Sequence, residues 1–129
     1  MKPINPDNYD QEDINMAFDH FVAQGQNIVS KYMEERFPML PCPTVEVRPG
    51  SVYWKMVKVT PDPSISEGLD YVSSQKEYVY GFVRKSDGAI FKAASSKAPY
   101  TKGASAIRGY VTDEWAASTL TAHGVIYAQ

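Results

Sequence analysis

The feature that most restricts the fold is one long stripe of apolar residues near the N-terminus. Between Asp10 and Phe37, apolar residues recur every three or four positions, which is the spacing of one face of an α-helix. Asp10 is suited to cap the first turn, and Pro38 and the prolines that follow it end the helix. The sequence therefore predicts an amphipathic helix of about 26 residues that packs through one face only. The stripe comprises Ile14, Ala17, Phe18, Phe21, Val22, Ile28, Val29, Tyr32, Met33 and Phe37.

Alternating apolar residues in the middle of the chain predict an antiparallel sheet of about four strands, arranged as two hairpins. The first hairpin joins residues 44–48 to residues 51–59 through a Pro-Gly turn. The second joins residues 71–84 to residues 89–94 through a Ser-Asp-Gly turn. Strict alternation in the strand that ends at residue 84 places its aromatic side chains, Tyr78, Tyr80 and Phe82, on one face, opposite Val79 and Val83.

The C-terminal third predicts less regular structure. Residues 95–109 have no clear period and indicate a long loop, with a short helix near residues 104–107. Thr112 is a suitable cap for a last short helix over residues 113–122. The chain is thus expected to form a single α+β domain over residues 1–129, with residues 1–9 as an irregular arm. Because the long helix covers one face of the sheet, the other face is left to water, the C-terminal segment or a partner.

Composition excludes several classes of protein. A chain of 129 residues, 43% apolar and 22% charged, fits one globular domain. Cys42 is the only cysteine, so no intrachain disulfide can form and a reducing compartment is expected. The sequence contains no apolar run long enough to span a membrane, and its polar, acidic N-terminus does not resemble a signal peptide.

Familiar catalytic patterns are missing. The sequence contains no glycine-rich phosphate loop, no H-E-x-x-H helix and no G-x-S-x-G elbow. Ser73 and Lys76 fit S-x-x-K, but the companion motifs of enzymes that use it are absent. His20, His123 and Cys42 have no metal-ligand spacing. We therefore expect no catalytic residue, no metal and no cofactor, and a protein that is not an enzyme.

Positive charge gathers in one stretch of this otherwise acidic chain. Residues 76–108 hold seven Lys or Arg and two Asp or Glu, a net charge of +5 against −2 for the whole chain. Small residues and hydroxyls between the basic ones would let a phosphate approach the backbone, and nearby tyrosines would offer stacking surfaces. The alternative is that the lysines solvate a loop and the aromatics form core. The candidate phosphate-binding residues are Arg84, Lys85, Lys92, Lys97, Lys102 and Arg108, and the candidate stacking residues are Tyr78, Tyr80 and Tyr100.

The same stretch resembles a pattern found in a family of small uncharacterised bacteriophage proteins. The pattern reads F-V-x-x-x-x-G-x-I-x-K-A-A-S-x-K-A-P, followed by R-G. The matching residues are Tyr80, Phe82, Val83, Gly88, Ile90, Lys92, Ala93, Ala94, Ser95, Lys97, Ala98, Pro99, Arg108 and Gly109. The resemblance covers about a quarter of the chain and implies a viral protein that acts in the cytoplasm of a host bacterium. It implies no activity.

These observations favour a small non-enzymatic phage accessory protein that binds an anionic partner through residues 84–108. Single-stranded nucleic acid is the expected partner, and the sequence does not distinguish DNA, RNA and a small nucleotide. Two alternatives stay open: an inhibitor that binds a host or anti-phage defence protein through the uncovered sheet face, and a virion or packaging component. The sequence leaves the oligomeric state open, because an exposed sheet edge or aromatic face can pair two copies.

Overall fold

The computed structural model describes residues 9–61, 75–103 and 106–125. The elements follow in the order α1 (Gln11–Arg36), β1 (Thr44–Pro49), β2 (Tyr53–Pro61), β3 (Gln75–Arg84), β4 (Ala89–Phe91), β5 (Gly109–Tyr110), η4 (Ala116–Thr119), β6 (Leu120–Thr121) and β7 (Gly124–Val125). Most of the predicted arm, part of the 71–84 strand and part of the predicted 104–107 helix lie outside the described residues.

The long helix is confirmed. Asp10 caps α1 reciprocally, since its carboxylate accepts a 2.9 Å hydrogen bond from the Asp13 amide and the Asp13 carboxylate accepts one of 3.3 Å from the Asp10 amide. The stripe is buried or half-buried from Ile14 to Val29, but its last member, Phe37, is 45% exposed. The helix therefore packs against the sheet along most of the length of α1, and the C-terminal end of α1 is exposed.

The α+β class is confirmed, with five strands in the main sheet in place of about four. The order is β1-β2-β3-β4-β5, and every pair described is antiparallel. The fifth strand comes from the end of the predicted loop, where Val111 donates a backbone hydrogen bond to the Gly88 carbonyl and Arg108 donates one to the Ile90 carbonyl. These bonds fix the end of the loop against the short β4.

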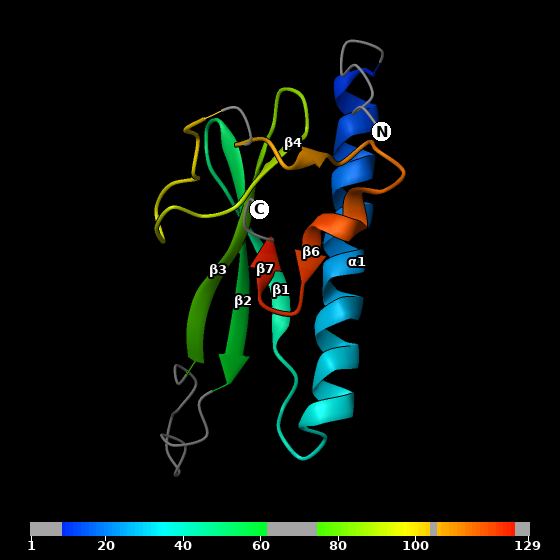
Figure 1. Ribbon diagram of the computed structural model, residues 1–129, viewed down its shortest axis with the longest axis vertical. Coiled ribbons are helices and arrows are strands. Elements are labelled where there is room, and N and C mark those ends of the chain that lie inside the picture. Colours follow the sequence, from blue (N-terminus) through cyan, green and yellow to red (C-terminus); the bar gives the residue numbers. More distant parts are fainter. Residues whose placement is uncertain (1–8, 62–74, 104–105, 126–129) are drawn as a thin grey trace.

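The C-terminal helix is shorter than predicted. Only Ala116–Thr119 is helical, as a 3-10 turn, and the chain then forms the small β6–β7 hairpin in place of a longer α-helix. Thr121 stabilises this hairpin, because its hydroxyl donates to the Gly124 carbonyl and accepts from the His123 amide. Figure 1 shows β6 and β7 on the same side of the main sheet as α1.

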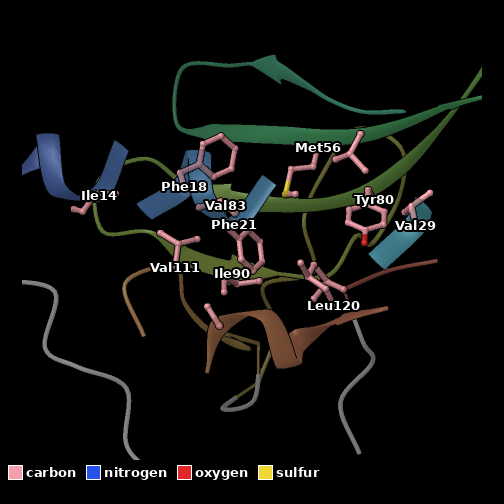
Figure 2. Close-up of a cluster of buried hydrophobic side chains, with 13 residues drawn as sticks. Ile14, Phe18, Phe21, Val29, Met56, Tyr80, Val83, Ile90, Val111 and Leu120 are labelled. Carbon is pink, nitrogen blue, oxygen red and sulfur yellow. The ribbon is translucent and has the colours of Figure 1, made fainter. Parts of the chain in front are cut away.

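The main core lies between these two layers. The Phe18 ring stacks on Trp54 of β2, with ring centroids 4.1 Å apart and planes 8° from parallel. Figure 2 shows helix residues and sheet residues meeting in one cluster, with Leu120 closing it from the C-terminal segment. The cluster includes Ile14, Phe18, Phe21, Val29, Met56, Tyr80, Val83, Ile90, Val111 and Leu120.

A β-bulge in β3 makes one prediction wrong. Met56 pairs with Gly81 and Val57 pairs with Val79, so Tyr80 has no partner on β2. The extra residue reverses the alternation along β3. Tyr80 therefore belongs to the helix-side core, whereas Phe82 belongs to a second cluster with Phe91 and Ala106. Tyr80 and Phe82 do not share a face.

Candidate functional site

The centre of the basic stretch folds on itself as a short hairpin, which we call the 92–100 hairpin. The Tyr100 amide donates a 2.9 Å hydrogen bond to the Lys92 carbonyl, and Ala93 forms a bridge with Pro99. At the tip the Ser95 hydroxyl accepts a 3.1 Å hydrogen bond from the Lys97 amide, which closes a serine turn. The K-A-A-S-x-K-A-P pattern therefore corresponds to a locally closed hairpin with Ser95 and Lys97 exposed.

Two hollows flank this hairpin and share Pro99. The first, which we call the Lys55 hollow, has a volume of about 460 Å³ and lies against the turn between β1 and β2. The second, the Lys102 hollow, has a volume of about 470 Å³ and lies against residues 99–102. No Asp or Glu occurs among the described residues that line either hollow. The basic lining residues are Arg48, Lys55 and Lys97 in the first hollow and Lys92 and Lys102 in the second.

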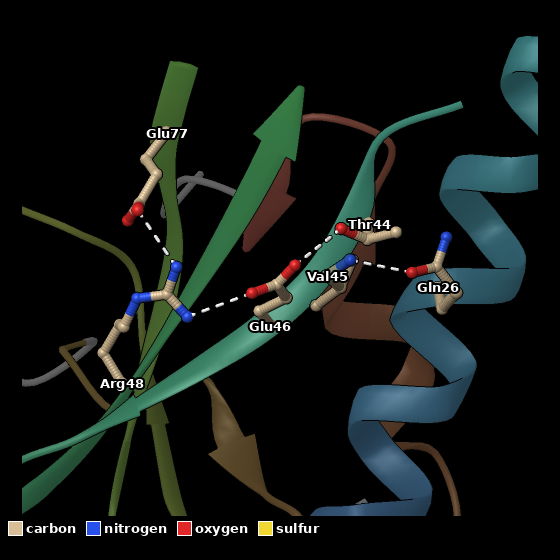
Figure 3. Close-up of polar contacts among 6 residues, drawn as sticks. All are labelled: Gln26, Thr44, Val45, Glu46, Arg48 and Glu77. Atoms are coloured by element: carbon tan, nitrogen blue, oxygen red, sulfur yellow. Dashed lines mark hydrogen bonds and ion pairs between the residues drawn. The ribbon is translucent and has the colours of Figure 1, made fainter. Parts of the chain in front are cut away.

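The charge of Arg48 is already balanced by two carboxylates. Its guanidinium lies 3.0 Å from Glu77 and 3.2 Å from Glu46 (Figure 3). Hydrogen bonds to Glu77 and then to Glu46 raise the pKa of Arg48, and hydrogen bonds from Thr44 and Arg48 lower the pKa of Glu46. Arg48 is therefore a weaker candidate for binding a phosphate than the lysines around it.

The lysines approach the hollows from three different segments. Lys55 projects from β2 on the face away from α1, next to Tyr53, and is half-buried. Lys97 and Lys102 are exposed. The Lys92 ammonium lies 4.6 Å from the centre of the Tyr100 ring, within the range of a cation–π contact. Positive charge and one aromatic ring are therefore adjacent on this surface.

Three of the predicted basic residues do not line these hollows. Arg84 forms a two-pronged ion pair with Asp87, at 3.0 and 2.7 Å, and lies over the Phe91 ring. The Lys85 backbone joins two segments, since its amide donates to Val52 and its carbonyl accepts from Gln11. Arg108 is half-buried beside β4, and its amide donates to Ile90.

The Arg84–Asp87 pair explains why a basic residue stands at this turn. The Asp87 carboxylate also accepts a 3.0 Å hydrogen bond from the Ala89 amide, which starts β4. Burial alone would raise the pKa of Asp87, but the hydrogen bonds from Arg84 and the Ala89 amide outweigh it and lower that pKa. The hydrogen bond to Asp87 in turn raises the pKa of Arg84. The pair closes the β3–β4 hairpin.

The three predicted stacking tyrosines have three different environments. Tyr80 cannot stack on a ligand, because its ring is 2% exposed inside the core. Tyr78 is 53% exposed, but it lines a separate hollow near the end of α1. Only Tyr100 lies among the lysines.

Sequence reasoning missed Lys55 and Tyr53. Both lie outside the stretch in which positive charge is concentrated, and they reach the Lys55 hollow because β2 pairs with β3. The available signal was the alternation of β2, which places Tyr53 and Lys55 on the face opposite Trp54 and Met56.

Comparisons of this chain with family models, curated proteins and solved structures gave no match. The resemblance to bacteriophage proteins therefore stays a prediction. Within the described parts of the chain, no cluster of three or more His, Cys, Asp or Glu side chains is arranged to hold a metal ion. No helix in those parts has both the length and the apolar character needed to cross a bilayer.

Proposed function

We propose that the protein is a non-enzymatic binder of single-stranded nucleic acid, and that the strand lies across the 92–100 hairpin. One observation carries the proposal. Five basic side chains line two adjoining hollows that share Pro99, and no carboxylate is among the described lining residues. A strand that passes from one hollow to the other would follow a path of positive charge.

The chemistry of the surface suits a sequence-tolerant contact. Lys55, Lys97 and Lys102 supply point charges that pair with phosphates without selecting a base. Tyr100 supplies a ring on which any base can stack. The hollows are shallow surface features of moderate volume, which fits an extended chain better than an enclosed nucleotide.

The acidic helix on the opposite layer restricts where a polyanion can bind. Residues 11–36 hold five Asp or Glu and two Lys or Arg. A polyanion approaching that layer meets net negative charge, whereas the face away from α1 presents the lysines. Charge asymmetry of this kind orients an encounter and accelerates it. The resemblance to phage proteins would place such binding in the cytoplasm of an infected bacterium.

Fluorescence anisotropy of a labelled, mixed-sequence 20-mer tests the proposal. If four lysines each neutralise one phosphate, the logarithm of the affinity should fall with the logarithm of salt concentration with a slope of about −3. Lys55→Gln and Lys97→Gln should each weaken binding and reduce the slope by about 0.7. Lys31→Gln, on the exposed side of α1, is the matched control and should change neither the affinity nor the salt slope. Absence of binding at low salt would overturn the proposal.

Glu77→Gln provides a gain-of-binding test on the same surface. Removing this carboxylate releases one of the two ion pairs that balance Arg48, which lines the Lys55 hollow. Affinity should rise about twofold to fivefold at low salt, and the increase should vanish in the double variant Glu77→Gln with Arg48→Gln. An equal increase in both variants would show that the effect does not pass through Arg48.

A further inference from the structure

A second surface, separate from the Lys55 and Lys102 hollows, carries exposed apolar side chains. It lies where α1 ends and the connector to β1 begins, at the end of the molecule where β2 stops and β3 starts (Figure 1). Met39 is 91% exposed, Leu40 54%, Tyr78 53% and Phe37 45%. Large apolar side chains gathered at one place on a small domain are typical of a protein interface. We call this surface the connector patch.

A hollow of about 440 Å³ lies within the connector patch. Its walls are mainly apolar and come from the last turn of α1, the connector and the helix-side face of the sheet. Two of its lining residues are basic, Lys58 and His123, and no described lining residue is acidic. The apolar walls are Met33, Phe37, Leu40, Pro43 and Tyr78.

The bulge at Tyr80 explains why Tyr78 faces this hollow. The bulge puts Tyr78 on the same side as α1, although Phe82 on the same strand faces away. Lys58, the partner of Tyr78 on β2, lies on that side too. Because α1 ends at Arg36, it does not cover this end of the sheet. The patch is therefore the part of the helix-side face that the chain's own helix leaves uncovered.

Lys58 gives the hollow its charge. Its ammonium donates a 3.1 Å hydrogen bond to the Ala122 carbonyl, which holds the side chain at the edge of the hollow. Partial burial lowers the pKa of this ammonium, because the charged form loses hydration there. A carboxylate placed beside it would return part of that lost stabilisation, whereas a second cation would increase the penalty.

We infer that the connector patch binds a protein segment that presents a large apolar side chain next to a carboxylate. The apolar side chain fills the hollow between Phe37 and Tyr78, and the carboxylate pairs with Lys58. A protein segment fits better than a small molecule, because the exposed Met39 extends the apolar surface beyond the hollow itself. The inference is independent of nucleic-acid binding, which uses the opposite face of the sheet.

Amide chemical shifts in a ¹⁵N NMR titration test the inference, with capped tetrapeptides as probes. The peptide acetyl-Gly-Phe-Asp-Gly-amide should shift the amides around Tyr78 and His123 in a saturable way. Replacing its Asp by Asn should weaken binding about fivefold, and replacing its Phe by Ala should abolish measurable binding. Equal affinity for the Asp and Asn peptides would overturn the pairing of the carboxylate with Lys58. Chemical-shift changes confined to other surfaces would overturn the connector patch as the binding site.

Two matched pairs of variants separate the patch from general effects. Leu40→Ser should weaken binding of the Phe-Asp peptide by about tenfold. Val52→Ser removes a side chain that is similarly exposed, at 52%, but lies at the turn between β1 and β2, and should change nothing. Lys58→Met should remove the preference for Asp over Asn, whereas Lys55→Met, on the other face of the same strand, should keep it.

Sedimentation equilibrium tests for a second copy as the occupant. If the protein forms a dimer that Leu40→Ser dissociates and Val52→Ser does not, the patch binds another copy, and the inference of an acidic partner segment is overturned. A monomer in both variants, together with the peptide results above, supports it.

Discussion

The phenolic hydroxyl of Tyr80 donates a 2.6 Å hydrogen bond to the main-chain carbonyl oxygen of Thr121. This bond joins the bulge in β3 to the β6–β7 hairpin, across a sequence separation of 41 residues. The ring of Tyr80 also packs against Gly25, where an added Cβ would lie 3.2 Å from it. One side chain therefore contacts the helix, the sheet and the C-terminal hairpin.

Replacing Tyr80 by Phe should lower the free energy of unfolding by about 1–2 kcal/mol, because the Thr121 carbonyl loses its donor in a partly buried setting. The midpoint of urea unfolding measures the change. Tyr78→Phe removes the hydroxyl of an exposed tyrosine on the same strand and should alter stability by less than about 0.5 kcal/mol. Equal losses in the two variants would contradict a structural role for this bond.

Tyr80 should also make stability depend on alkaline pH. Burial raises its pKa from 10.0 to about 12, so the folded protein keeps the phenol proton where the unfolded chain loses it. The contribution is complete below about pH 10 and is lost as the pH rises through about 12. Wild type should lose stability between these values faster than Tyr80→Phe, as measured by urea midpoints at each pH. If the urea midpoints of wild type and Tyr80→Phe fall in parallel as the pH rises, the buried phenol of Tyr80 does not cause the loss of stability.

Gly124 should tolerate no side chain. Its φ is +134°, and an added Cβ would lie 2.6 Å from the Tyr80 carbonyl oxygen. Gly124→Ala should therefore cost about 2–4 kcal/mol from backbone strain and overpacking together. Gly103 is the control, since its φ is +86° and no atom lies within 4 Å of an added Cβ. Gly103→Ala should cost only about 1 kcal/mol, and thermal unfolding compares the two.

Gln26 attaches the helix to the start of β1 (Figure 3). Its side-chain oxygen accepts a 2.7 Å hydrogen bond from the Val45 amide, and its nitrogen donates one of 3.1 Å to the Pro43 carbonyl. Gln26→Ala should destabilise the protein by about 2 kcal/mol, because two backbone groups lose their partners. Gln24→Ala makes the same change in helix propensity and should cost less than about 0.5 kcal/mol. A similar loss of stability in Gln26→Ala and Gln24→Ala would show that the effect comes from helix propensity and not from the hydrogen bonds to Pro43 and Val45.

Local patterns determined the elements that the sequence predicted correctly. The cap at Asp10, the stripe from Ile14 and the stop at Pro38 are all contained within one helix, so its bounds follow from the residues themselves. The β1–β2 hairpin was predictable for the same reason. Gly25 was different: by local rules it only weakens the helix, whereas the structure gives it a packing role against Tyr80.

The remaining features depend on contacts between distant residues. Apolar and polar residues alternate regularly in the sequence of β3 and give no sign of the bulge at Tyr80. The prediction therefore placed Phe82 on the same face as Tyr80, which is wrong. The C-terminal hairpin replaces a predicted helix because Thr121 and Gly124 pack against β3, which local propensity does not include. In the candidate site, charge content identified Lys92, Lys97 and Lys102, but only strand pairing brings Lys55 to them.

The bulge in β3 has a consequence for sequence change in this chain. Deleting Tyr80 would remove the bulge without changing the faces of its neighbours, because Gly81 and Val79 already pair with the successive β2 residues Met56 and Val57. Tyr78 would stay in the connector patch and Glu77 would stay beside Arg48, whereas the core would lose the side chain that contacts the helix and the C-terminal hairpin. A single-residue deletion at the bulge would thus cost core packing and leave both proposed interfaces in place.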